Sequence, residues 1–391
     1  MYYQQICAFL IRNYVLVQMY ITLLIPLPHL SWLTTMLRLG WLAWLAGPAT
    51  KLLLSLMMTV YEKVSFMVGN VLYFLNIFTN VVTICEVMLK AKKCRRVLRL
   101  ERELDELLQK QVDISGMELK VWLNASYHVI LHIIYDVIHL GIAFVGYKSP
   151  VFYQAAPLMV VQRMRYVQII QAIERQTLRS SYMIDALQVL VCANRTKYKY
   201  TSAVWQPYTL WEYERLNSLR LIQGRLCELH ESVSNCYGWS AIVLIFTTFF
   251  TLVSNLFWCI IIAKNKSNPM QFFYNMMTML RLGTMMTTLL VFGDRARRNN
   301  AKISYLINKL AKPFGNKIYN DLVSNFAIQC QHKGLTIDVK GFCTLDLALL
   351  KQMIVLIVTY LIMLIQFLGS EKQISQDNEV PANKTIKVFY D

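Results

Sequence analysis

The chain has 391 residues, of which 56% are hydrophobic and only 16% charged, and its formal net charge is +17. Soluble domains have about a quarter of their residues charged, so this composition excludes an ordinary soluble protein and indicates an integral membrane protein. The excess of lysine and arginine could suggest nucleic acid as a partner. These residues flank apolar segments, however, where membrane topology explains them, so we expect no nucleic-acid partner.

Apolar segments long enough to cross a bilayer recur along the whole chain. A spanning helix needs about 20 predominantly apolar residues. The segment 33–60 has this length although Pro48 and Lys51 interrupt it, and 6–27 is a second candidate that carries Arg12. Six clearer runs follow at 66–89, 121–146, 150–173, 238–263, 271–292 and 343–368. The sequence predicts an all-α membrane protein with seven transmembrane helices, or eight if 6–27 also crosses.

The basic residues predict how these helices are oriented. The segments 90–120, 163–237 and 293–341 hold 9, 10 and 9 of the 40 lysines and arginines. Loops rich in lysine and arginine stay on the cytoplasmic side of a membrane. Seven helices then place the N-terminus in the cytoplasm and the C-terminus outside, whereas an eighth helix would move the N-terminus outside.

The long basic segments also have helical periodicity. Leu216, Leu219, Ile222 and Leu226 fall near one face of a helix, and few helix breakers interrupt these segments. We expect the spans to continue as helices into a cytoplasmic anchor region where subunits could assemble. The predicted organisation is an N-terminal segment at 1–32, spans one to six with their extensions at 33–292, an anchor segment at 293–341, a last span at 342–368 and an extracellular tail at 369–391.

Covalent and catalytic motifs add little. The nine cysteines lie in predicted helices or cytoplasmic loops without a C-x-x-C pair, so we expect no disulfide framework and no zinc site. Sequons at Asn265 and Asn383 fall in predicted external segments, where glycosylation could occur, whereas those at Asn124 and Asn194 do not. The chain has no nucleotide loop, nucleophile elbow or H-E-x-x-H motif, so we expect neither enzymatic activity nor a cofactor.

A polar stripe runs along the last predicted span. Gln352, Thr359 and Gln366 are seven residues apart, and seven residues of α-helix fall about 20° short of two full turns. They therefore share one face of an otherwise apolar helix. Such a stripe could hydrogen-bond to neighbouring helices, or it could face water in a pore.

A second polar stripe lies in the span at 121–146. His128, His132, Asp136 and His139 recur at spacings of four, four and three residues, which places them on one helix face. Ionisable groups at membrane depth are a functional hypothesis by default. Three interpretations stay open: lining of a pocket, hydrogen bonding between helices, and metal or proton chemistry.

The C-terminal stretch carries a family signature. Thr359-Tyr360, five apolar residues and Gln366-Phe367 match the TYhhhhhQF signature of insect gustatory receptors, where h is any apolar residue. The chain resembles this family in length, helix number and basic loops as well. Leu361 stands where members resembling sugar receptors commonly have Glu. The resemblance is therefore to the divergent group associated with bitter or other aversive compounds.

The segment that leads into the last span supports the same resemblance. Gly341, Phe342 and Asp346 stand where similar residues usually occur in that family. A G-protein-coupled receptor would have its N-terminus outside and D-R-Y and N-P-x-x-Y motifs, which are absent. A secondary transporter would show two related halves, and no internal repeat is visible.

The resemblance implies a ligand-gated, non-selective cation channel in the plasma membrane of sensory neurons, assembled as a homotetramer or a heterotetramer with other gustatory receptors. Its last helix would line the pore, with Gln366 and Phe367 as the gate, Tyr360 beside them, and membrane lipid around the assembly. The alternative is a seven-helix receptor or transporter without intrinsic channel activity.

The resemblance also places a pocket for a small-molecule tastant among the outer halves of the second to sixth helices. The aromatic and polar residues in those halves are Tyr73, Asp136, His139, Tyr153, Asn255, Trp258, Tyr274 and Arg281. A guanidinium in a membrane span needs a partner, so Arg281 is expected to meet Asp136 or a ligand.

Overall fold

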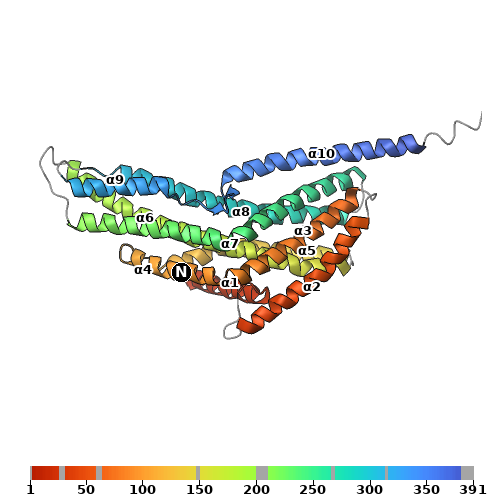
Figure 1. Cartoon of the computed structure of the whole chain (residues 1–391), viewed down its shortest axis with the longest axis horizontal. Coiled ribbons are helices and arrows are strands. Elements are labelled where there is room, and N and C mark those ends of the chain that lie inside the picture. Colours follow the sequence, from red (N-terminus) through yellow and green to blue (C-terminus); the bar gives the residue numbers. More distant parts are fainter. Residues whose placement is uncertain are drawn as a thin grey trace, which may run out of the picture.

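The computed structural model describes residues 2–25, 31–58, 64–146, 150–199, 210–265, 269–312 and 316–379. Its helices are α1 (Tyr2–Ile21), α2 (Ser31–Met58), α3 (Val64–Leu89), α4 (Ala91–Gln109), α5 (Met117–Gly146), α6 (Pro150–Lys199), α7 (Leu210–Asn265), α8 (Pro269–Asn308), α9 (Lys317–His332) and α10 (Leu347–Glu379). Figure 1 shows them as an elongated bundle from which α10 diverges at one end. The predicted helical membrane fold is confirmed.

The seven predicted spans correspond to α2, α3, α5, α6, α7, α8 and α10. Within the described residues, α3, α5, α7, α8 and α10 are each long and apolar enough to cross a membrane by length and composition. The remaining two spans contain charged residues that lower their mean hydropathy. These residues include Lys51 in α2, and Arg163 and Arg165 in α6.

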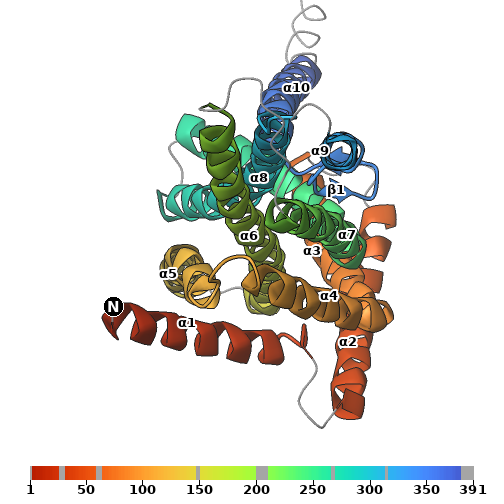
Figure 2. The same ribbon diagram turned by 90° about the vertical axis from the view of Figure 1, so that its left-hand side faces the viewer.

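The first helix does not run alongside the spans. In the view along the bundle, α1 lies across the bundle axis beside α5 (Figure 2). Its buried face, which includes Ile11, Val15 and Met19, packs in one cluster with Trp122 of α5 and Met164 of α6. The segment proposed as an eighth span is therefore a helix that crosses the bundle and ends at Ile21.

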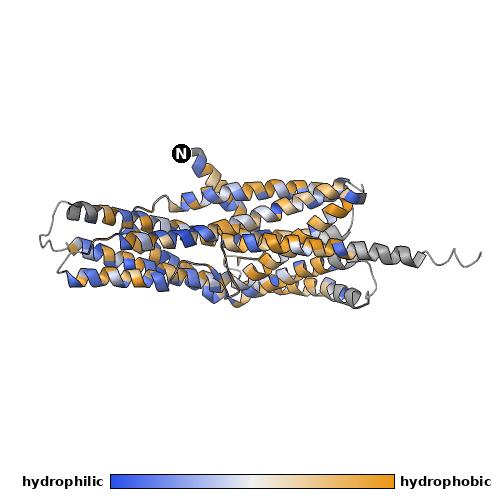
Figure 3. Ribbon diagram, turned by 90° about the horizontal axis from the view of Figure 1, so that it is seen from above, coloured by the Kyte–Doolittle hydropathy of each residue, from blue (hydrophilic) through white to orange (hydrophobic). Residues whose placement is uncertain are grey.

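Two halves of different polarity follow each other along the bundle (Figure 3). With 1.5 Å of rise per residue, the 50 residues of α6 and the 56 of α7 span about 75 and 84 Å. A bilayer core is about 30 Å thick, so more than half of each helix lies beyond it. The polar half contains α4, α9 and the extensions of α6, α7 and α8. We call it the basic end.

The basic end has its own packed core. Leu104, Leu187, Leu219, Ile307 and Phe326, which come from five different helices, are all buried in one cluster. Hydrophobic burial in water stabilises this part, as it does a soluble helical domain. The predicted helical extensions are thus confirmed as a packed structure.

A short β-hairpin precedes the last helix and was not predicted. Strand β1 (Asp338–Val339) pairs with β2 (Cys343–Thr344) in antiparallel register. Lys340 and Gly341 turn the chain with φ of 56° and 76°, and the Asp338 carboxylate accepts the Gly341 N–H at 2.8 Å. Positive φ at two successive residues is the requirement of a tight hairpin turn. The last helix therefore starts at Leu347, later than the expected 343.

Two contacts fix the start of α10. The Asp346 carboxylate accepts the N–H groups of Ala348 and Leu349 at 3.0 and 3.1 Å and so caps the helix. On α8, a Cβ placed on Gly293 would lie 2.0 Å from the carbonyl oxygen of Leu345. Only glycine permits this approach of helix to backbone.

We expect Gly293→Ala to push the hairpin away from α8 and to cost about 1–3 kcal/mol of stability, because backbone atoms cannot yield as a side chain can. The measurement is thermal unfolding of the detergent-purified chain. Gly283→Ala on the same helix is the matched control, since its Cβ would meet nothing within 4 Å. Equal melting temperatures for the two variants would contradict the assigned contact.

Candidate ligand site and pore helix

The last helix is covered far less than its neighbours. Of the 18 most apolar consecutive residues within its span, Leu347–Phe367, only 6% are buried, against 50% for the corresponding residues of α7 and α8. Phe367 has 65% of its surface exposed. An apolar helix that its own subunit covers so weakly must be surrounded by lipid or by other subunits, because water would not solvate its apolar surface.

The polar stripe of this helix points away from the rest of the subunit. Gln352, Thr359 and Gln366 are all exposed. On the other side, Met353 is buried in the cluster shared with α7 and α8, and Leu364 packs against it. At 100° per residue, the two faces lie about 120–140° apart. The exposed stripe therefore lies on a different face of α10 from the one that packs on α7 and α8.

One aromatic contact ties the middle of α10 to α7. The rings of Tyr360 and Phe249 meet edge to face with centroids 5.8 Å apart. This geometry is favourable for aromatic pairs. Tyr360 of the signature therefore holds α10 against its own subunit and does not belong to the polar stripe.

Asp136 joins three helices, α5, α6 and α8. Its carboxylate accepts Nη1 of Arg281 on α8 at 3.0 Å, as the sequence predicts, and it also pairs with Nη1 of Arg163 on α6. Sequence reasoning missed Arg163 as a site residue, because it falls at the edge of the basic segment 163–237. The side chains of both arginines are 7% exposed.

This cluster contains one more cation than anion. The Arg163 guanidinium also interacts electrostatically with Tyr14 of α1. The Nε of Arg281, in contrast, is buried and has no hydrogen-bond partner among the described residues. A buried donor without a partner costs free energy, so this nitrogen is disposed to bind an acceptor supplied from outside the chain.

The aromatic side of the cluster is next to the ion pair. His139 lies one turn beyond Asp136 on α5, and Thr278 and Tyr274 lie one and two turns before Arg281 on α8. The His139 ring stacks on Tyr274 with centroids 4.2 Å apart, and its Nε2 hydrogen-bonds to Thr278 at 2.9 Å. Asp136, His139, Tyr274 and Arg281 therefore gather between α5 and α8. Four of the predicted pocket residues are thus neighbours.

The histidine stripe faces α8 along its length. His128 lies 3.4 Å from the Thr288 hydroxyl, and His139 bonds Thr278, so both histidines form hydrogen bonds between helices. Nδ1 of His132 is buried without a partner among the described residues. Within the same residues, no group of three or more potential ligands could hold a metal ion.

The other predicted pocket residues lie elsewhere. Tyr73 packs against a small cluster of α2, α3 and α6. Asn255 bonds the Thr251 carbonyl oxygen of its own helix at 2.7 Å, and Trp258 contacts Phe257 edge to face. The side chains of Tyr153 and of the sequon residue Asn265, and the whole of Asn383, lie outside the described part.

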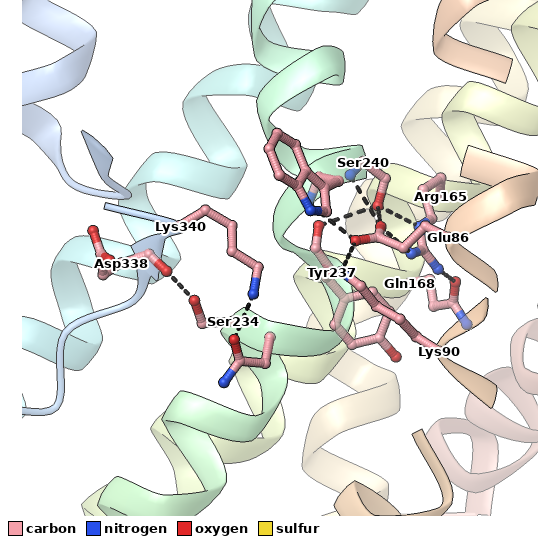
Figure 4. Close-up of polar contacts among 11 residues, drawn as sticks. Glu86, Lys90, Arg165, Gln168, Ser234, Tyr237, Ser240, Asp338 and Lys340 are labelled. Carbon is pink, nitrogen blue, oxygen red and sulfur yellow. Dashed lines mark hydrogen bonds and ion pairs between the residues drawn. The ribbon is translucent and has the colours of Figure 1, made fainter. Parts of the chain in front are cut away.

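A buried carboxylate at the end of α3 joins the apolar half to the basic end (Figure 4). Glu86 accepts Nη2 of Arg165 at 2.9 Å and Nζ of Lys90 at 2.5 Å. It also accepts the N–H groups of Trp239 and Ser240 at 3.0 Å each. The side chains of Glu86 and Arg165 are each 2% exposed. Two of these bonds go to the backbone of α7 near mid-length, where its ribbon changes direction (Figure 1).

The same part of α7 holds the hairpin that leads into α10 (Figure 4). Lys340 extends over Gly238, where a Cβ would lie 2.8 Å from its Cγ, and its Nζ donates to Asn235 at 2.5 Å. The Ser234 hydroxyl donates to the carbonyl oxygen of Asp338. We call Glu86 and its donors the Glu86 junction. The hairpin before the last helix is thus joined to this junction through less than two turns of α7.

Comparison with known proteins agrees with this architecture. The family model described as "7tm Chemosensory receptor" matches residues 18–368. Gustatory receptor 23a of Drosophila melanogaster is 28% identical over 190 residues, which are 48% of this chain and 50% of that receptor. Putative gustatory receptor 2a of the same species is 24% identical over 310 residues, 71% of this chain and 72% of that receptor.

A solved structure shares the fold. The insect olfactory receptor OR5 from Machilis hrabei, in complex with eugenol, superposes with a TM-score of 0.64 at 13% identity, over 92% of this chain and 99% of that one. A second structure of the same receptor superposes with a TM-score of 0.62 at 11% identity, over the same shares of the two chains. With a family model that matches nearly the whole chain, the protein belongs to the 7tm chemosensory receptor family.

Proposed function

We propose that this protein is a gustatory receptor that works as a ligand-gated, non-selective cation channel, with α10 of each subunit lining a shared pore. The observation that carries the proposal is the weak coverage of α10 together with its outward polar stripe. Four copies of Gln352, Thr359 and Gln366 around an axis would give rings of neutral hydrogen-bonding groups. Without carboxylates among these rings, discrimination between cations is expected to be weak.

The gate in this proposal is a ring of Phe367 side chains. Phe367 follows the last residue of the polar stripe and is 65% exposed in the single subunit. Apolar side chains that converge on an axis exclude water, and a dry constriction blocks ions without filling the pore completely. Ligand binding would open the gate by separating these rings.

The ligand site in this proposal is the cluster of Asp136, His139, Tyr274 and Arg281. It combines an aromatic wall, from the stacked His139 and Tyr274, with a donor on Arg281 that lacks a protein partner among the described residues. Apolar sites with a few placed polar groups suit small organic ligands. The related fold of OR5 was solved with eugenol, a small organic compound. Leu361 in the signature favours bitter or other aversive tastants over sugars.

The Glu86 junction would carry the signal from the ligand site to the pore. α6 contributes Arg163 to the ligand cluster and Arg165, two residues later, to Glu86. Glu86 bonds α7, and α7 holds the hairpin before α10 through Asn235 and Ser234. A shift of α6 at the ligand site would thus change the contacts that position the last helix.

Recording currents from cells that express the chain, alone and with other gustatory receptors, tests the proposal against a panel of bitter compounds. A tag after residue 391 that is accessible on intact cells would support the proposed topology, with the C-terminus outside and the basic end in the cytoplasm. Ligand binding without current in every combination would favour a receptor or transporter without channel activity.

The gate predicts that Phe367→Ala raises the current measured without ligand, because a smaller side chain widens the dry constriction. The matched control is Ile365→Ala, which removes an exposed apolar side chain at similar depth but on another face of α10. Currents are compared at equal surface expression. Unchanged basal current in the Phe367 variant, or the same increase in both variants, would refute the gate.

The charge cluster makes a prediction about three variants. Arg281→Gln leaves one carboxylate and one guanidinium, Asp136 with Arg163, and should preserve surface expression while weakening the ligand response about tenfold or more. Asp136→Asn leaves two buried cations and should reduce expression strongly.

The double variant Asp136→Asn with Arg281→Gln removes one of those two cations, so its expression should exceed that of Asp136→Asn alone. Surface labelling measures expression, and the concentration for half-maximal current measures the response. If the double variant is no better expressed than Asp136→Asn, the two groups do not share the cluster energetically.

A further inference from the structure

The first turns of α4 carry a dense basic face. Six of the eleven residues from Lys92 to Arg102 are exposed lysines or arginines, namely Lys92, Lys93, Arg95, Arg96, Arg99 and Arg102. The one acidic residue in this stretch, Glu101, is buried and bonds Nη1 of Arg179 at 3.0 Å. The charged side chains exposed in this stretch are therefore all cationic.

The opposite face of α4 is apolar and occupied. Val97, Leu100, Leu104 and Leu108 are buried in the core of the basic end. At 100° per residue, Lys92, Arg95, Arg96 and Arg99 fall within about 100° of each other, on the far side from this buried face. Packing therefore fixes the rotation of α4, and the basic side chains cannot turn inward.

Internal ion pairs use little of this charge. Within the described part of the chain, one of the six cations forms an ion pair: Arg96 meets Glu228 at 2.9 Å, and Arg96 is itself 66% exposed. An exposed pair of this kind contributes little free energy and leaves the guanidinium accessible. The face consequently keeps nearly all of its charge for an external partner.

The position of α4 indicates which partner that is. The apolar span of α3 ends at Leu89, and α4 begins two residues later at Ala91. A helix rises 1.5 Å per residue, so the six basic residues lie within about 20 Å of the end of a membrane span, and the first four of them within about 11 Å. Anionic lipid headgroups attract basic residues within about a Debye length of 8 Å of the surface.

Resting on the proposed topology, in which the basic end is cytoplasmic, we propose that this face binds anionic phospholipid of the inner leaflet. Polyphosphoinositides are the class that fits best. Their phosphomonoesters offer several closely spaced charges, and guanidinium groups such as those of Arg95 and Arg99 bind phosphate oxygens in pairs. Bound lipid would hold α4 to the membrane beside the Glu86 junction, because Lys90 links the two helices at that point.

The test uses the full chain in nanodiscs of neutral phosphatidylcholine, with and without a few per cent of phosphatidylinositol bisphosphate. Fluorescent phosphatidylinositol bisphosphate reports binding, and soluble inositol trisphosphate is the free-headgroup competitor. The test variant is Arg95→Gln with Arg99→Gln. The control is Lys302→Gln with Lys317→Gln, which removes the same charge from exposed positions elsewhere at the basic end.

We expect the Arg95 and Arg99 variant to bind the lipid about 30-fold more weakly, and the control less than about threefold more weakly. Equal losses in both variants, or absence of lipid binding by the unmodified chain, would overturn the proposal. Tighter binding of soluble inositol trisphosphate than of the lipid would also overturn it, and so would retention by an acidic protein such as calmodulin without lipid binding. Ligand-evoked current and the side of the C-terminal tag are measured separately, so loss of lipid binding alone leaves the channel proposal standing.

Discussion

Glu86 is the interaction on which the arrangement of the two halves depends. A carboxylate this deeply buried is stable only when many donors compensate for the loss of water. Arg165, Lys90, the Ser240 hydroxyl and two backbone N–H groups of α7 supply them. Glu86 stands on α3 and its donors come from α6, from α7 and from the residue after α3, so satisfying one charge fixes three long helices at a single level of the bundle.

The Asp136 cluster obeys the same electrostatics but with a different balance. At Glu86, five donors bond the two oxygens of one carboxylate, so the carboxylate has no unused acceptor site and the network is closed. At Asp136, two guanidiniums share one carboxylate, and Nε of Arg281 is left over among the described residues. A network whose polar groups are all bonded resists change, whereas one with an unbonded donor becomes more stable when a ligand supplies an acceptor. Both networks include an arginine of α6, and these two arginines are two residues apart, so this helix connects the Glu86 network to the proposed ligand site.

Much of this architecture could be predicted from hydrophobic length and charge. The spans, the helical extensions and the contact of Asp136 with Arg281 follow from apolar runs and from the cost of isolated ions in a membrane. Two kinds of feature could not be predicted. The hairpin at 338–344 depends on positive φ at Lys340 and Gly341, for which a lone Lys-Gly pair is a weak signal. Arg163 and Arg165 stand at the edge of a basic segment, and only the continuation of α6 as one helix places them inside the bundle. The predicted pocket residues Tyr73, Asn255 and Trp258 lie apart from the Asp136 cluster, because the rotation of each helix is set by packing and not by apolar length.

The attachment of α10 has a consequence for how the protein is made. Of the described helices this one is made last, and its own subunit meets it mainly through the hairpin and a narrow apolar face. The other helices can therefore complete their packing before α10 has found its final neighbours. In the proposed assembly, a subunit that has not yet met its companions carries this unburied apolar helix in the endoplasmic reticulum. The proposed assembly therefore implies that the supply of companion subunits limits how much receptor reaches the cell surface.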